Sequence, residues 1–249
     1  MTDQLETDND KPWWAGPWFL VSAVLVALLV VLGLVLWLWP EGQEQSQSQP
    51  APATAAEASS GGESVCGLSA TGGTTLTKAP KDVEWEALGA IYAPASKKHG
   101  PGTVDESTGV RSCYSHTPEG SLLASTNMLI SGNDPQVLLD TIEARVMEGP
   151  GKNIAIGQAQ QRVSENDTMT VPLEVAGFRL LSYTDDKATV EVVLAADDGT
   201  EKVYTTTATD MVWHEGDWRF LLQDDGSGGP VSGQISDLSV YILWNPDNG

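Results

Sequence analysis

Residues 18–39 form one uninterrupted apolar run, WFLVSAVLVALLVVLGLVLWLW, with no charged side chain. A helix rises about 1.5 Å per residue, so a run of this length can cross a bilayer core about 30 Å thick. Tryptophan rings favour the membrane–water interface, and here they occupy both ends of the run: Trp13, Trp14, Trp18, Trp37 and Trp39. The sequence therefore predicts a single membrane-spanning helix with the lipid bilayer as a partner.

Two alternatives to an anchor are a cleaved signal peptide and a buried core helix. A signal peptide has a basic start and an apolar stretch of about 7–15 residues, whereas this leader is acidic with Lys11 as its one basic side chain. Small residues in APATAAEA keep a later cleavage site open. A core helix would carry a polar face, and the run has only Ser22.

The predicted orientation rests on positive charges near the ends of the span. Lys11 precedes the run, and no Lys or Arg follows it until Lys78. Positive residues favour the cytoplasmic side. We therefore expect a cytoplasmic leader over residues 1–17, a transmembrane helix over 18–39 and an extracytoplasmic body, which makes a single-pass protein of the cell membrane.

The two cysteines, Cys66 and Cys113, both follow the span. Their spacing matches no CxxC, zinc or haem pattern. In an exported domain such a pair is most simply a disulfide; the alternative is two unpaired thiols in a cytosolic body.

The formal net charge is −21. A strongly negative surface repels phosphate backbones, so nucleic acid is not an expected partner. Residues 40–64 are rich in Gln, Ser, Pro and Ala, and they cannot bury enough apolar surface to offset the entropy of ordering. They predict a disordered stalk, which leaves residues 65–249 as the exported domain.

Helix signals come first within this domain. Thr117 and Asp134 are each followed by proline, a pattern typical of helix starts. We expect the second helix to stop at the Gly-Pro-Gly run 149–151 and a third helix to cover residues 154–163.

Alternating strands follow from about residue 170. We expect a bulge near Ala176-Gly177 and four strands over about 171–184, 188–194, 203–213 and 218–222. This order predicts an α+β fold in which helices cover one face of a curved antiparallel sheet.

The hairpin Gly216-Asp217-Trp218-Arg219, after helices and long strands, resembles the cone-shaped NTF2-like fold. With the predicted span and stalk, the chain resembles bitopic conjugation proteins of the VirB8 and TcpC type over residues 18–39 and 115–223. The segments WEALGAIYAPAS, CYSHTPEGSLLAS and DLSVYILW are similar to uncharacterised membrane proteins of actinobacterial mobile elements. The predicted fold class is thus an N-terminal transmembrane helix plus an NTF2-like cone. The resemblance implies a scaffold subunit of a type IV secretion channel.

Candidate chemistry is sparse. No HExxH, GxSxG or phosphate-cradling motif occurs, so we expect no catalytic residue, metal or cofactor, and no enzyme. His99 is expected to be solvated, and His116 to cap a helix or pack. Possible pocket residues on the strands are Tyr183, Tyr204 and Asp210.

The leading hypothesis is a noncatalytic, membrane-anchored subunit of a conjugative or secretory assembly. Its partners would be other envelope proteins or further copies of itself. Two alternatives remain: a membrane-tethered enzyme or small-molecule-binding protein that uses the cone interior, and a general cell-envelope accessory protein.

Overall fold

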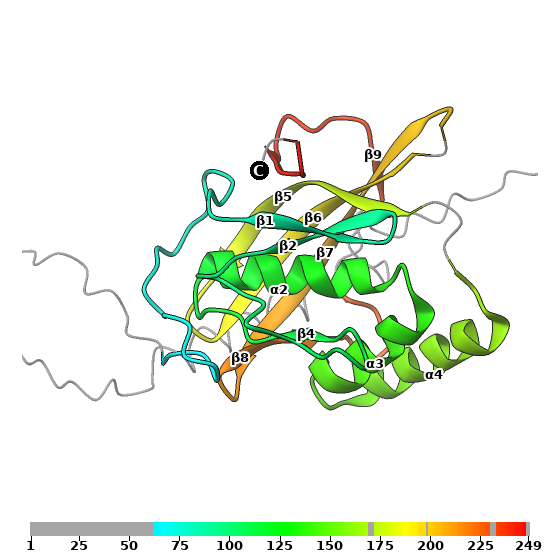
Figure 1. The fold of residues 1–249 in the computed structure, drawn as a ribbon, viewed down its shortest axis with the longest axis horizontal. Helices are drawn as coiled ribbons and strands as arrows, with labels where there is room; N and C mark the ends of the chain where they lie inside the picture. The colour runs from blue at the N-terminus through cyan, green and yellow to red at the C-terminus, as the bar shows by residue number, and fades with distance from the viewer. Residues whose placement is uncertain (1–61, 169–171, 198, 230–232, 248–249) are drawn as a thin grey trace, which may run out of the picture. The chain divides into compact units, whose positions relative to one another are not determined.

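The computed structural model describes residues 62–168, 172–197, 199–229 and 233–247. Figure 1 shows their arrangement. The helices are α2 (Pro118–Ser131), α3 (Pro135–Arg145) and α4 (Pro150–Glu165). The strands are β1 (Glu84–Leu88), β2 (Ile91–Ala95), β3 (Thr103–Val104), β4 (Arg111–Ser112), β5 (Leu173–Tyr183), β6 (Lys187–Asp197), β7 (Lys202–His214), β8 (Asp217–Leu221), β9 (Gln234–Ile235) and β10 (Ile242–Leu243).

The main sheet is an antiparallel meander of β5, β6, β7 and β8, with β10 on the free edge of β5. Strand β9 pairs with Tyr204 and Thr205 near the start of β7. The register between β5 and β6 shifts between Val175 and Gly177, which confirms the predicted bulge. Alternating apolar residues form these strands because one face of the sheet is buried beneath the helices.

Helix α2 packs across the main sheet and contacts the β1–β2 hairpin, which lies beside it in the view of Figure 1. Its Ser125 Oγ is 2.6 Å from Thr209 Oγ1 on β7. On the other side, Asn127 Nδ2 donates to the Pro94 carbonyl of β2 at 3.0 Å. Polar side chains on both sides of α2 are therefore buried and hydrogen-bonded to the sheet and the hairpin.

The helix starts follow the sequence signals. Thr117 Oγ1 accepts from Gly120 N at the start of α2, and the Asp134 carboxylate accepts from Gln136 N and Val137 N at the start of α3. The predicted third helix begins earlier than expected, at Pro150. Proline fits the first helical position because its missing N–H would have no partner there, so the Gly-Pro-Gly run also starts α4.

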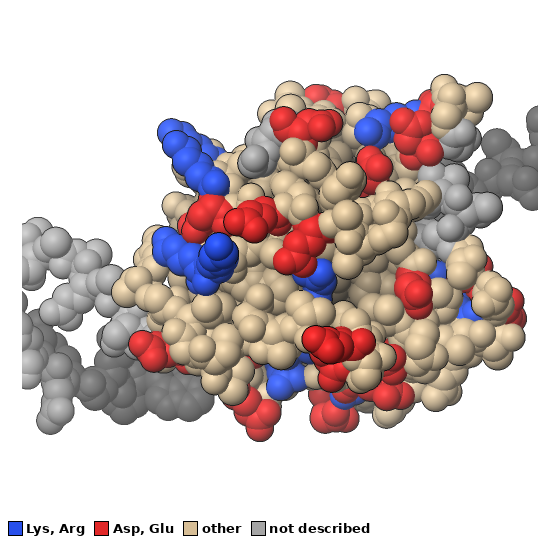
Figure 2. Space-filling model, viewed as in Figure 1, with Lys and Arg blue, Asp and Glu red and all other residues tan. Residues whose placement is uncertain are grey.

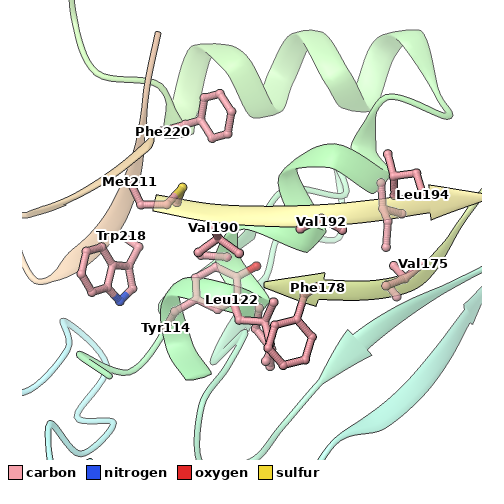
Figure 3. Packing of buried hydrophobic residues seen from close by; sticks show 14 of the residues in the cluster. Tyr114, Leu122, Val175, Phe178, Val190, Val192, Leu194, Met211, Trp218 and Phe220 are labelled. Atoms are coloured by element: carbon pink, nitrogen blue, oxygen red, sulfur yellow. The ribbon is translucent and has the colours of Figure 1, made fainter. Parts of the chain in front are cut away.

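The core lies between α2 and the concave side of the sheet. Leu122 of α2, Phe178 of β5, Val190 of β6 and Trp218 of β8 are almost fully buried there, and Figure 3 shows them around Tyr114. Residues from three strands and one helix therefore meet in a single apolar cluster.

The C-terminal tail (residues 233–247) packs on the opposite face of the sheet, where Leu238 and Tyr241 contact a small apolar cluster of β5 and β6. Tyr241 Oη donates to Glu191 Oε1 at 3.2 Å, and the Arg179 guanidinium bonds Glu191 Oε2 at 2.7 Å. Trp244 at the end of the tail is fully buried, 4.9 Å from the ring of Trp85. The tail therefore packs on part of the face opposite α2, and Trp244 at its end joins the core cluster that contains Phe178.

The predicted fold class, a membrane-spanning helix joined to an NTF2-like cone, is corrected. Over the described ranges no helix is long and apolar enough to cross a membrane. The longest, α4, has 16 residues, against about 20 apolar residues for a span. These ranges form three helices and a mostly β-sheet domain. The span predicted over 18–39, its tryptophans (Trp13, Trp14, Trp18, Trp37 and Trp39) and the leader lie outside the described residues.

Candidate functional site

A cavity of about 580 Å³ lies between α2, α3, the β1–β2 hairpin, β4 and the β7–β8 end of the sheet. Its wall is mainly apolar, with large side chains from the hairpin, from α2 and from the β7–β8 end of the sheet: Ile91, Met128, Ile130, Met211, Trp218 and Phe220. The exposed side chains of Leu88 and Val104 also belong to the wall, so the cavity reaches the surface. Its size and its apolar lining are those of a small-molecule site.

A buried ion pair supports one side of this cavity. Arg145, the last residue of α3, places Nη2 at 2.6 Å from Asp217 Oδ2 and donates to the Trp218 carbonyl at 2.7 Å. The Asp217 carboxylate also accepts from Cys113 N at 2.6 Å and Tyr114 N at 3.0 Å. The carboxylate and the guanidinium therefore satisfy each other and join α3 to β8.

The disulfide predicted between Cys66 and Cys113 is confirmed, with Cα atoms 6.1 Å apart. Cys113 has a positive φ of 65°. In this left-handed conformation the successive amides of Cys113 and Tyr114 both face the Asp217 carboxylate, as in an anion-binding nest. The disulfide therefore fixes the segment that carries Tyr114 into the cavity wall.

Three residues of the cavity wall carry buried polar atoms that lack a hydrogen-bond partner among the described residues. These atoms are Arg111 Nε and Nη1, Tyr114 Oη and Asn127 Oδ1. Arg111 Nη2 donates to Glu86 Oε2 at 2.7 Å, so only part of its guanidinium is used. A buried polar atom without a partner is rare in proteins and costs about 1–3 kcal/mol.

The Tyr114 side chain is fully buried, and Figure 3 shows its hydroxyl oxygen directed into the apolar cluster. Burial raises the pKa of the Tyr114 phenol far above its usual range, while Arg145 and Arg111 act in the opposite direction. Burial dominates because it penalises the phenolate. The hydroxyl therefore keeps its proton and can donate one hydrogen bond.

The three residues predicted to line a pocket do not line this cavity, although Tyr204 lines a second one. The Tyr183 ring packs against Trp218 at 5.8 Å, and Asp210 Oδ1 accepts from Thr189 Oγ1 at 2.8 Å. Tyr204 lines a smaller cavity of about 290 Å³ beneath the C-terminal tail. None of the three lines the larger cavity, and they do not come together in one site.

The expectation for His99 is wrong, because this side chain is buried. Its Nδ1 lies 3.0 Å from Ser115 Oγ, and its Nε2 lies 3.6 Å from Asp82 Oδ2. This order resembles an acid–His–Ser triad. However, Ser115 is fully buried and its Oγ is 2.7 Å from Thr117 Oγ1, the cap of α2. The arrangement therefore supports the start of the helix and gives a substrate no access to the serine.

His116 packs as expected. Its ring stacks on Trp213 with centroids 3.9 Å apart and an interplanar angle of 4°, and its Nε2 bonds the carbonyl of Asp185. In the part of the chain that the structure describes, no group of three or more His, Cys, Asp or Glu side chains could hold a metal ion.

Sequence reasoning missed Arg111, Tyr114, Asn127 and Arg145. Two of them carried a signal: Asn127 lies four residues after Leu123, and Arg145 lies seven after Leu138, so each shares a helix face with an apolar residue. A polar side chain on an apolar helix face is unusual and indicates a buried partner. Arg111 and Tyr114 lie outside the helices and have no such periodicity.

Comparisons with known proteins place the chain in one family. No curated protein and no solved structure matches it. A family model described as a domain of unknown function, DUF8175, matches residues 45–243, which is most of the chain. The chain therefore belongs to the DUF8175 family.

Proposed function

We propose that this domain is an exported, noncatalytic module that binds a small, largely apolar molecule in the cavity between α2 and the β1–β2 hairpin. The observation that carries the proposal is the cavity itself. Its volume of about 580 Å³ falls in the range of about 300–1,000 Å³ that ligand sites occupy. Its apolar wall with a few buried polar atoms suits a ligand with a large apolar body.

The frame around the cavity favours binding without rearrangement. The Cys66–Cys113 disulfide and the Arg145–Asp217 ion pair both hold segments of its wall. A site held in its binding geometry loses less conformational entropy when the ligand binds. The same disulfide supports an oxidising compartment outside the cytoplasm.

Membership of a secretion or conjugation assembly stays a prediction, as do envelope-protein partners and the absence of nucleic-acid binding. The face shown in Figure 2 has acidic side chains spread across it, with basic ones close to them. This mixture supports the prediction that nucleic acid is not a partner, because a nucleic-acid site needs a continuous basic surface.

A neutral fluorescent probe, N-phenyl-1-naphthylamine, tests the binding proposal on the full-length protein. Ala90 is exposed and lies at the rim of the cavity, so Ala90→Trp should obstruct the entrance. Ala87 is exposed in the same hairpin but does not line the cavity, which makes Ala87→Trp the matched control. We expect saturable binding that Ala90→Trp weakens at least tenfold and Ala87→Trp leaves unchanged. Equal binding by all three proteins would overturn the proposal.

A further inference from the structure

We propose that the ligand of this cavity is an anionic amphiphile: a molecule with one carboxylate head that binds Arg111 and an apolar body that packs on the rest of the wall. This inference rests on the proposed binding function and adds the chemical class of the ligand. The inference depends on which charged side chains line the cavity and on which of them already have hydrogen-bond partners.

The wall holds three charged side chains in the described part of the chain, namely Arg111, Asp134 and Arg145. Arg145 is neutralised by Asp217 at 2.6 Å. Asp134 accepts two backbone amides at the start of α3. Among these three, Arg111 is the one with buried polar atoms that lack a partner among the described residues.

Arg111 is only partly neutralised. Its side chain is 9% exposed, whereas that of its partner Glu86 is 50% exposed and contacts it through Nη2 alone. Two guanidinium nitrogens, Nε and Nη1, have no partner among the described residues. A guanidinium has five N–H donors in one plane and binds carboxylates well when it is shielded from water. A second carboxylate, brought by a ligand, would complete its coordination.

One further polar atom of the wall, the Tyr114 hydroxyl, suits a carboxylate head, whereas Asn127 Oδ1 is an acceptor and suits a donor elsewhere on the ligand. The Tyr114 hydroxyl keeps its proton and can donate to a carboxylate oxygen. Asn127 Nδ2 already donates to the carbonyls of Pro94 and Leu123 at 3.0 and 2.9 Å. This fixes the amide orientation and leaves Oδ1 as an acceptor for an O–H or N–H of the ligand.

The remaining wall suits the apolar body. Met128 and Ile130 of α2 line the cavity together with Met211, Trp218 and Phe220 of the sheet. Methionine side chains adapt their shape to irregular ligands. The site therefore combines one cationic end with a deformable apolar chamber, which is the complement of an alkyl or aryl carboxylate.

The test compares decanoate with decanol, which share a chain length and differ in head charge. Each would be titrated as a monomer at neutral pH into the full-length protein, with displacement of N-phenyl-1-naphthylamine as the readout. We expect decanoate to bind at least tenfold more tightly than decanol. Arg111→Gln should remove this difference, because decanoate would lose the guanidinium that binds its carboxylate.

The matched control is Arg162→Gln, because Arg162 lies on α4 and does not line the cavity. This variant should keep the preference for decanoate. Equal binding of decanoate and decanol, or a preference that survives Arg111→Gln, would overturn the anionic-head inference and leave the binding function standing. No displacement by either compound, together with no probe binding that Ala90→Trp weakens, would overturn both.

Discussion

Arg145 and Asp217 form a buried ion pair, with Arg145 Nη2 2.6 Å from Asp217 Oδ2 and side chains that are 10% and 2% exposed. The pair joins the end of α3 to the start of β8. Since Asp217 also accepts the amides of Cys113 and Tyr114, one carboxylate holds three separate segments of the chain together beside the cavity.

Removal of the arginine should therefore be costly. We expect Arg145→Met to lower the free energy of unfolding by about 3–5 kcal/mol, because a buried carboxylate loses its counter-ion. Arg162→Met is the control; Arg162 pairs with the exposed Asp167 and should cost less than about 1 kcal/mol. Chemical denaturation of both variants measures the difference. An equal loss in the free energy of unfolding for the two variants would contradict a stabilising role for the buried ion pair.

Tyr114→Phe should have the opposite effect. The Tyr114 hydroxyl is buried without a partner among the described residues, so its removal should leave the ligand-free protein as stable or more stable by up to about 1 kcal/mol. Tyr241→Phe is the matched control, because Tyr241 Oη donates to Glu191 and its removal should cost about 1 kcal/mol. A larger loss for Tyr114→Phe than for Tyr241→Phe would contradict the assignment of Tyr114 Oη as an unused group.

The disulfide should stabilise the fold. It closes a loop with a sequence separation of 47, which corresponds to about 4 kcal/mol in the chain-entropy model and commonly to about 2–4 kcal/mol in practice. The double variant Cys66→Ser/Cys113→Ser should unfold at lower denaturant concentration by that amount. Nonreducing mass spectrometry of the native protein should find one linked peptide pair. Two thiols open to alkylation in the untreated protein would count against both the bond and the exported location.

His99 should make the fold sensitive to acid. Burial lowers the pKa of His99 below its usual 6.5, although Glu119 and Asp82 act in the opposite direction. At a pH above about 6.5 neither folded nor unfolded state binds the proton, so stability is unaffected there. As the pH falls through this value the unfolded state takes up the proton first, and stability declines until the folded state is protonated as well.

Unfolding midpoints measured between pH 8 and pH 5, a range of about three units around the usual histidine pKa, test this expectation. His99→Gln should flatten the decline, whereas His214→Gln should keep it, because His214 is 48% exposed. A decline of the same slope in both variants would assign the acid sensitivity to other groups.

The local parts of the fold were predictable because their signals are local. The Thr117 and Asp134 caps determine where α2 and α3 begin, and alternation of apolar and polar residues, broken near Ala176-Gly177, predicts the long strands. The start of α4 was misplaced, since a Gly-Pro-Gly run can end one helix and begin another. The tail was not predicted either, because Trp244 becomes buried only through contacts with Trp85 and Phe178, which are distant in the sequence.

The cavity was not predictable because its wall is assembled from distant segments. Arg111, Arg145 and Trp218 meet only in the folded chain. Tyr204 and Asp210 alternate along β7 with Thr209 and Met211, which face α2 and the cavity. Successive residues of a strand point to opposite faces, so Tyr204 and Asp210 lie on the face on which the tail packs.

Methyl NMR of the full-length protein, labelled at methionine and isoleucine, tests the binding site most directly. On addition of decanoate we predict shifts for the methyl groups that line the cavity: Ile91, Met128, Ile130 and Met211. The methyl groups of Met147, Ile154 and Ile235 lie outside the cavity and should keep their positions. Shifts confined to this second set, or no shift in either set at saturating decanoate, would contradict the assignment of the cavity as the ligand site.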